Sequence, residues 1–308
     1  MFAKGNYMKI IQRNQWILLL LLVIIPNCRA QSVPKFDPQN AFRHLARQCE
    51  YGPRVPGTPS HLSCRDYLVA TLQGYADRVT QQPFQAMMGP DKKRVSCYNI
   101  IANFQMNNPR RVLLCAHWDT RPWADLDPDP ANHQKPVPGA NDGASGVAVL
   151  LEIARILKLS PPKYGVDIVL FDAEDLGSYG QNDTWALGSK QFASQVVRNF
   201  RPEFGILLDM IGDADQQIYI EQNSHRFARP VVERVWRKAD QLGISEFISE
   251  IKFDVHDDHI NLLEIGIPTI DIIDFDYKYW HTISDTPDKC SPTSLDNVGR
   301  VVLGVIYD

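Results

Sequence analysis

The chain has 308 residues, of which 44% are hydrophobic and 22% are charged. This length and apolar content are enough for a folded protein with a sizeable core, so a disordered or fibrous chain is excluded. The 32 basic and 36 acidic residues give a net charge of −4, which gives no indication of a nucleic acid or another polyanion as partner.

The N-terminus predicts export. Basic residues precede the apolar run WILLLLLVIIP, whose 11 residues are too few to span a bilayer and are typical of a signal peptide. Small residues at Cys28 and Ala30 predict cleavage after Ala30, giving a signal peptide over 1–30 and a mature chain over 31–308. We expect that chain in the periplasm or outside the cell, without a membrane span. Lipid anchoring through Cys28 is disfavoured, because the preceding IIPN lacks the small residues of lipidation sites.

The predicted mature chain is more acidic and has an odd number of cysteines. Cleavage removes four basic residues and no acidic one, so the net charge becomes −8. The cysteines that remain are Cys49, Cys64, Cys97, Cys115 and Cys290. By loop length Cys49 and Cys64 could form a disulfide in an oxidising compartment, whereas Cys115, within RVLLCAH, is expected to be a buried thiol. No CxxC pattern is present, which argues against a cysteine zinc site.

Strand-like and helix-like segments alternate from about residue 95 onward. SCYNIIANF (96–104) and RVLLCAH (111–117) resemble two adjacent strands joined by a polar turn. Continuous apolar runs that end in acids predict buried central strands over 165–175, 203–213 and 267–275. Helical spacing predicts helices over 146–159 and over 229–243, the second closed by Gly243.

These elements predict one α/β domain, with a central mixed sheet flanked by helices. Neither a repeat nor a domain-scale linker interrupts the pattern. The Pro- and Asp-rich segment 125–139 is a long loop, and long loops in compact domains are often functional.

Polar residues follow the predicted strands, where open α/β sheets carry their active sites. They are His117, Asp119, Asp142, Glu174, Asp175, Asp209, Asp257, Asp258, His259, Trp280 and His281. Several have a simpler explanation: Asp142 could cap a helix, Glu174 and Asp175 could form a solvated turn, and His281 could be a hydrogen-bonded core residue. Asp209 differs, because a carboxylate between apolar runs needs a partner or a metal. Other histidines, His61 among them, are expected on the surface or in loops.

Carboxylates and imidazoles without thiolates are the ligands of a catalytic zinc site, which has three protein ligands and one open position. The helical H-E-x-x-H motif is absent from the sequence, and so are the G-x-S-x-G elbow of serine hydrolases, the P-loop and the dinucleotide fingerprint. The residues therefore favour metal chemistry at the strand ends.

The order of these motifs resembles that of the zinc-dependent exopeptidase clan, which includes aminopeptidases. HWD, ANDGASG, AED, LLDMIGD and WHT follow one another over roughly residues 95 to 285. Within the clan, DDHI at 257–260 and WHT at 280–282 are similar to the animal-like, zinc-containing glutaminyl cyclases, or glutaminyl-peptide cyclotransferases. This resemblance implies that the substrates are peptides or proteins with N-terminal Gln, converted to pyroglutamate with release of ammonia.

Carried over by position, the resemblance makes Asp142, Asp175 and His281 the ligands of one zinc ion per chain. It makes Glu174 the general base and acid, and Asp257 a catalytic residue that holds the substrate amine.

It further places Asp209 near that amine and Trp280 in the wall of the substrate pocket. The sequence departs from the animal enzymes at Asp175, where they have Glu. It also has Tyr179 and Gly180 where they have a Trp.

Two alternatives remain. A dizinc aminopeptidase would use a second metal site, and its residues are all present: His117, Asp142, Glu174, Asp175, Asp209 and His281. His117 is otherwise a remnant of that second site. A binding module without activity would need a broken ligand set, and none is broken in the sequence.

Overall fold

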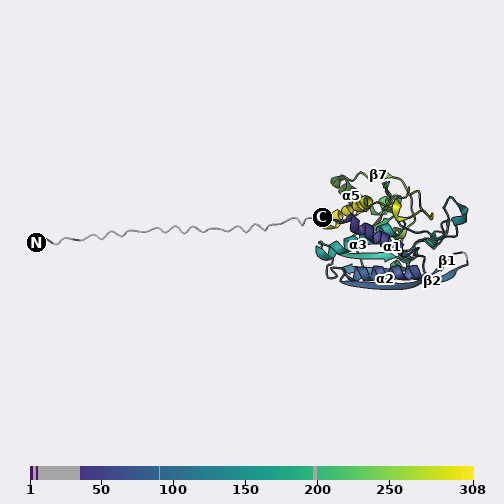
Figure 1. The fold of residues 1–308 in the computed structure, drawn as a ribbon. Helices are drawn as coiled ribbons and strands as arrows, with labels where there is room; N and C mark the ends of the chain where they lie inside the picture. Colours follow the sequence, from purple (N-terminus) through teal and green to yellow (C-terminus); the bar gives the residue numbers. More distant parts are fainter. Residues whose placement is uncertain (3–4, 6–34, 90, 197–199) are drawn as a thin grey trace. The chain divides into compact units, whose positions relative to one another are not determined.

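The computed structural model describes residues 1–2, 5, 35–89, 91–196 and 200–308 (Figure 1). The predicted signal peptide, its cleavage point and the lipidation alternative at Cys28 lie outside these residues. Contacts divide the chain into Met1–Gln31 and Ser32–Asp308, and the sheet, the helices and the site all belong to the second unit. Within the described ranges, no helix is both long enough and apolar enough to cross a bilayer.

A six-stranded mixed sheet forms the centre of the fold, in the order β1-β2-β4-β3-β5-β8. The strands are β1 Arg78–Met88, β2 Lys93–Phe104, β3 Arg111–His117, β4 Gly165–Phe171, β5 Gly205–Asp209 and β8 Thr269–Ile273. β1, β2 and β4 pair antiparallel, while β4, β3, β5 and β8 pair parallel. A short pair, β6 Ile218–Ile220 with β7 Phe247–Ile251, forms a second, two-stranded sheet. The predicted mixed α/β architecture is confirmed.

The predicted pairing of 96–104 with 111–117 is wrong, because β4 lies between these two strands. Ile100 of β2 pairs with Leu170 of β4, and Cys115 of β3 pairs with Val169 of β4. β4 is buried along its entire length, as expected of an inner strand that is covered on both faces. Direct pairing of β2 with β3 would leave no inner position for it between these two strands.

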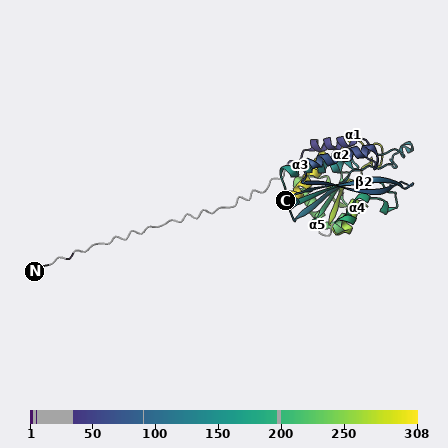
Figure 2. The same ribbon diagram turned by 90° about the horizontal axis from the view of Figure 1, so that it is seen from below.

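Helices cover both faces of the sheet; Figure 2 shows α1 and α3 on one side and α4 on the other. α1, α2, α3 and α7 pack on one face, α4 and α6 on the other, and α5 packs on β8 and α7. The helices are α1 Pro38–Glu50, α2 Pro59–Gln73, α3 Ala144–Leu159, α4 Leu187–Gln195, α5 Gln222–Leu242, α6 Asp258–Glu264 and α7 Pro292–Tyr307. Single turns of 3-10 helix lie at Pro130–Asn132, Asn182–Thr184 and Pro287–Lys289.

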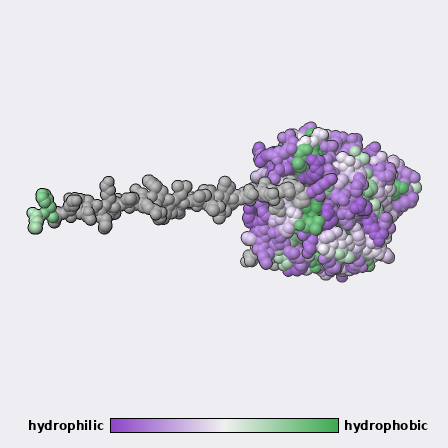
Figure 3. All heavy atoms as spheres, turned by 60° about the vertical axis from the view of Figure 1, so that its left-hand side comes forward, coloured by the Kyte–Doolittle hydropathy of each residue, from purple (hydrophilic) through white to green (hydrophobic). Residues whose placement is uncertain are grey.

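Packing on two faces explains why the inner strands are apolar throughout. On β3, Val112, Leu114 and Ala116 join the core beneath α3, while Leu113 and Cys115 join the core beneath α4 and α6. The predicted burial of Cys115 is confirmed. The face drawn in Figure 3 is mostly hydrophilic and carries small apolar patches, as expected when the apolar residues fill the core.

Two expectations about single residues are wrong. Cys49 and Cys64 are free thiols rather than a disulfide. His61 is fully buried instead of exposed: its Nε2 lies 2.9 Å from Asp172 Oδ2, and its ring stacks on Trp118 at 4.3 Å. The sequence of α2 gives no sign of this pair, because Asp172 is distant along the chain.

Asp274, directly after β8, gives the fold a pH-dependent weakness. It is buried, and its Oδ2 accepts a hydrogen bond from the backbone N–H of Gln217 at 2.9 Å. Burial, aided by Asp213 and Asp276, raises the pKa of Asp274 to about 7. The folded protein therefore keeps a proton that the unfolded chain releases at about pH 4, so stability falls as the pH rises through this window.

We expect Asp274→Asn to raise the melting temperature by several degrees at pH 8, and by little at pH 4, in differential scanning fluorimetry. The amide keeps the acceptor oxygen and cannot ionise. Asp240→Asn, at an exposed acid, is the control and should shift neither value. An equal gain from Asp274→Asn at both pH values would contradict this explanation.

Candidate active site

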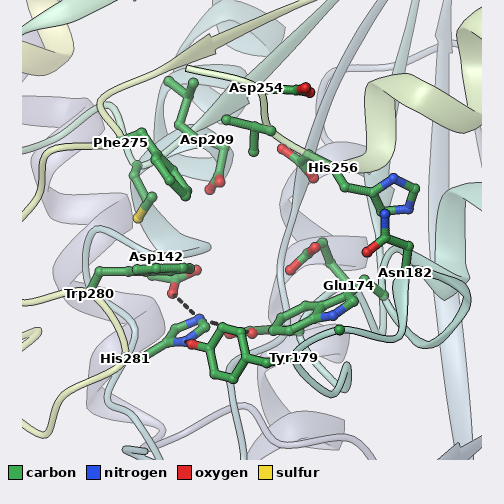
Figure 4. A pocket seen from close by; sticks show the side chains of 17 residues that line it. Asp142, Glu174, Tyr179, Asn182, Asp209, Asp254, His256, Phe275, Trp280 and His281 are labelled. Carbon is green, nitrogen blue, oxygen red and sulfur yellow. Dashed lines mark hydrogen bonds and ion pairs between the residues drawn. The ribbon is translucent and has the colours of Figure 1, made fainter. Parts of the chain in front are cut away.

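Polar side chains from several segments meet around one hollow at the carboxyl ends of the parallel strands. His117 ends β3, Glu174 and Asp175 follow β4, Asp209 ends β5, and Asp142 precedes α3. Figure 4 shows Asp142, Glu174, Asp209 and His281 facing this hollow. The common direction of β3, β4 and β5 places their ends at the same edge, as the sequence predicted.

The backbone turns sharply where these side chains emerge. Ala173, Met210 and His281 have φ values of 59°, 45° and 55°, a left-handed conformation that costs a residue with a Cβ about 1–3 kcal/mol. Gly143 has a φ of 96°, and a Cβ there would lie 2.6 Å from the carbonyl oxygen of Asp119. Such strain is typical of functional sites, where side-chain placement outweighs local preference.

Asp142, Asp175 and His281 bring ligand atoms within 4.8 Å of one another, and all three are buried. His281 Nε2 lies 3.2 Å from Asp175 Oδ1 and 3.7 Å from Asp142 Oδ2. Oδ2 of both aspartates is buried without a hydrogen-bond partner. Burial lowers the pKa of His281 to about 3, which gives the neutral imidazole that a metal ligand requires.

The simpler explanations of Asp142, Glu174 and Asp175 fail. Gly143 is the N-cap of α3, and no side chain caps that helix, so Asp142 is not a helix cap. Asp175 is buried and Glu174 is largely covered, so the pair is not a solvated turn. Two buried carboxylates beside a neutral imidazole, with unpaired oxygens, fit a divalent cation such as zinc.

Neighbouring groups hold these three side chains in place. The Tyr179 hydroxyl lies 2.7 Å from Nδ1 of His281. Arg121 donates from Nη1 to Asp175 Oδ1 at 3.3 Å and to its backbone oxygen at 3.2 Å. Asp285 accepts hydrogen bonds from the backbone N–H of Asp142 at 3.1 Å and of its predecessor at 2.8 Å.

Asp119 supports the turn after β4 rather than His117. Its carboxylate accepts hydrogen bonds from the backbone N–H groups of Glu174 at 3.1 Å and Asp175 at 3.3 Å. His117 Nδ1 lies 3.6 Å away, which is too long for a hydrogen bond. Asp119 therefore makes no hydrogen bond to His117.

A second trio shares Asp142 with the first. His117 Nε2 lies 3.1 Å from Asp142 Oδ1 and 3.1 Å from Asp209 Oδ1, and the three residues form a further candidate cation site. Burial opposes a charge on His117, but Asp119, Asp142 and Asp209 outweigh it and raise the pKa well above its usual value. A proton on His117 could thus balance these carboxylates in place of a second cation.

A third group of acids lies behind the hollow. Asp257, which lines it, lies close to His259 and Asp271, and Glu221 Oε2 lies 3.2 Å from His259 Nε2. Burial raises the pKa of Asp257 to about 6, aided by Asp209. Burial and then Asp257 raise the pKa of Glu174 well above its usual value. Glu174 and Asp257 therefore hold a proton more readily than a solvent-exposed carboxyl group does.

The hollow is a cavity of about 180 Å³ with aromatic walls. The Trp280 ring lies 4.1 Å from the His281 ring, and Trp185 stacks on His281 at 6.1 Å with an interplanar angle of 4°. Trp185 is not among the residues predicted for the pocket wall, where the sequence resemblance placed Tyr179 and Gly180 instead of a Trp. The loop after Asp175 returns to the cavity several residues later than expected, so all three lie around it.

Comparisons with known proteins agree with these observations. The family model of peptidase family M28 matches residues 99–306. A glutaminyl cyclase structure from Tannerella forsythia is 41% identical, over 89% of this chain and 99% of that chain, with a TM-score of 0.86. A zinc-dependent exopeptidase from Parabacteroides distasonis is 41% identical, over 90% and 100% respectively, with a TM-score of 0.87. The glutaminyl-peptide cyclotransferase of Bothrops jararaca is 25% identical over 286 residues, which span 81% of this chain and 75% of the relative.

Proposed function

The chain belongs to peptidase family M28 and, within it, to the glutaminyl cyclases, and from this membership and the geometry of the site we propose its activity. It converts the N-terminal glutamine of peptides or proteins to pyroglutamate and releases ammonia. The observation that carries the proposal is the buried trio Asp142, Asp175 and His281 beside Glu174, in a cavity with aromatic walls. An ammonia-release assay tests it: a Gln-initiated dipeptide should react, and an Asn-initiated one should not.

Asp142, Asp175 and His281 are our proposed ligands of one zinc ion. The unpaired buried oxygens of both aspartates support this choice, as does the neutral state of His281. With Nε2 directed to the ion, Nδ1–H would donate to Tyr179 and fix the ring. Zinc bound there would supply a Lewis acid for the γ-carbonyl oxygen of the substrate, worth several kcal/mol of charge stabilisation.

Glu174 is our proposed general base and acid. The α-amino nitrogen of the substrate attacks the γ-amide carbon, a C–N bond forms, and the bond to the departing nitrogen breaks. One proton must leave the attacking amine and reach that nitrogen, so ammonia departs and no water is consumed. A carboxyl whose pKa is raised by burial and by Asp257 can both accept and return this proton.

The remaining residues orient the substrate. Asp257, with Asp209 beside it, would hold the amine close to Glu174, which turns the attack into a well-oriented intramolecular step. Trp280 and Trp185 would pack against the aliphatic part of the glutamine and keep water out.

Arg121 compensates for the short Asp175 side chain in our proposal. Its guanidinium donates to both carboxylate oxygens of Asp125, from Nε at 2.8 Å and from Nη2 at 2.6 Å. Its remaining nitrogen, Nη1, lies 3.3 Å from Asp175 Oδ1. We expect Arg121→Met to weaken zinc affinity by about 10–100-fold, measured by competition with a chromogenic chelator. The zinc affinity of Arg121→Lys should lie between those of the native protein and Arg121→Met, because lysine keeps the positive charge but lacks the planar guanidinium.

Arg110→Met is the matched control for this prediction, since Arg110 forms an exposed pair with Glu203. It should leave the affinity as it is. An unchanged affinity in Arg121→Met would show that Asp175 needs no support from this side.

A dizinc aminopeptidase is the second candidate, because His117, Asp142 and Asp209 form a complete further trio. The number of metal ions and the products separate the two functions. The cyclase is expected to bind one zinc per chain and to release ammonia from Gln-initiated peptides. Two zinc ions per chain, with hydrolysis of Leu-initiated peptides, would support the aminopeptidase.

Export remains a prediction from the N-terminal sequence. Mass spectrometry of the protein from its native cell tests it: the expected mature chain begins at Gln31. A chain that starts upstream of residue 31, or that carries a lipid on Cys28, would contradict the predicted cleavage.

A further inference from the structure

A second cavity adjoins the active-site cavity. It measures about 610 Å³, and the two share Asn182, Asp254, Val255 and His256 as lining residues. Figure 4 shows Asp254, His256 and Asn182 on the side of the hollow away from His281. The second cavity, which we call the outer groove, is thus a continuation of the site.

The outer groove is lined by apolar side chains and by two acidic residues. Phe227 of α5 is 56% exposed there, and Ile260 and Leu263 of α6 line it beside Phe227. Asp254 and Glu264 are its charged lining residues among those the structure describes, and both are exposed acids. Such a surface attracts apolar and basic side chains and repels acidic ones.

Asp254 has a fixed place in the groove. Asn223 at the start of α5 donates from Nδ2 to Asp254 Oδ1 at 2.7 Å. Asp254 lies three residues before Asp257, the residue that we propose to hold the substrate amine. Val255 and His256 line both cavities, so a peptide whose amine lies at Asp257 has a continuous path across them into the outer groove.

We propose that the outer groove binds the residues that follow the N-terminal glutamine of the substrate, and selects apolar and basic side chains over acidic ones. This inference rests on the proposed cyclase function and adds to it the class of peptide. Continuity with the active-site cavity and the acidic lining identify the occupant.

The test compares kcat/KM for Gln-Lys-Lys-Ala-amide and Gln-Glu-Glu-Ala-amide, with glutaminamide as a reference that does not reach the groove. Exposed charge pairs have small effects, so we expect the lysine peptide to be favoured about tenfold at low salt. The preference should shrink in 1 M salt, because screening weakens exposed charges.

The double variant Asp254→Asn with Glu264→Gln should bring this ratio close to one. Because the ratio is taken within each variant, any change of basal turnover cancels. Asp240→Asn with Glu250→Gln removes the same charge from exposed positions outside the groove lining and should keep the ratio. Phe227→Ala should reduce the preference for Gln-Phe-amide over Gln-Ala-amide several-fold.

The outcomes separate the two proposals. If glutaminamide releases ammonia but the native ratio is one, or the ratio survives in the double variant, the groove proposal is overturned and the cyclase stands. If no Gln-initiated compound releases ammonia, the cyclase proposal fails, and the groove proposal fails with it.

Discussion

Replacing Glu174 by Gln is expected to lower kcat for cyclisation by about 10²–10⁴-fold while the bound zinc stays at the native level. The amide has nearly the same shape and can neither accept nor return the proton of the attacking amine. Glu174 belongs to none of the candidate cation sites, and Asp119 holds it through its backbone, so the substitution leaves the proposed ligands in place. Ammonia release at saturating peptide and elemental analysis of the same preparation measure the two effects.

The pH profile gives this prediction an independent readout. The native rate should fall on the acid side as Glu174 becomes protonated before the amine attacks. The residual rate of Glu174→Gln should lack the part of that acid limb that Glu174 causes and keep only the part that comes from protonation of the substrate's α-amino group. Glu250→Gln, at an exposed position, is the control and should keep the native kcat and the native acid limb of the pH profile. If Glu174→Gln retains more than a tenth of the native kcat, another group carries the proton.

The acids of the site could be predicted from sequence because their signal is local. An apolar run that ends in an acid, as before Asp175 and Asp209, identifies a buried strand and its active edge at once. The parallel pairing of β3, β4 and β5 then brings these ends together, whatever the details of the loops.

The order of strands could not be predicted in the same way. The predicted pairing of β2 with β3 rests on their closeness in sequence. The insertion of β4 between them depends on which strand is apolar on both faces, together with the return of the chain through α3. The strand order therefore follows from comparing all the strands with one another, and the sequence of any one strand does not reveal it.

Trp185 was missed for a different physical reason. The loop after Asp175 turns back at Ala186, which has a φ of 52°, and the Trp185 ring lies over Gly177, where a Cβ would overlap it. Gly177 is visible in the sequence, but the sequence does not show that it makes room for the ring of Trp185. The buried pair of His61 and Asp172 has the same origin, since α2 meets the end of β4 only in three dimensions.

Removing the metal is expected to have the largest effect of all. Asp142 belongs to both candidate trios around His117 and His281, so Asp142→Asn should empty either site. The proposed Lewis acid contributes several kcal/mol, and each 1.36 kcal/mol is a tenfold change in rate. We therefore expect kcat/KM to fall by at least about 10³-fold in this variant and in chelated native protein.

Stability should follow the same ion. Without it, Asp142 and Asp175 keep unpaired buried oxygens close together, whereas a bound cation stabilises the folded state in proportion to the logarithm of its concentration. Zinc should therefore raise the melting temperature of chelated native protein and restore its activity at one equivalent per chain, and it should do neither in Asp142→Asn. Asp240→Asn should respond as the native protein does. Full activity in protein that retains less than a tenth of an equivalent of metal would rule out a cation at this trio, and two equivalents for full recovery would assign the second one to His117, Asp142 and Asp209.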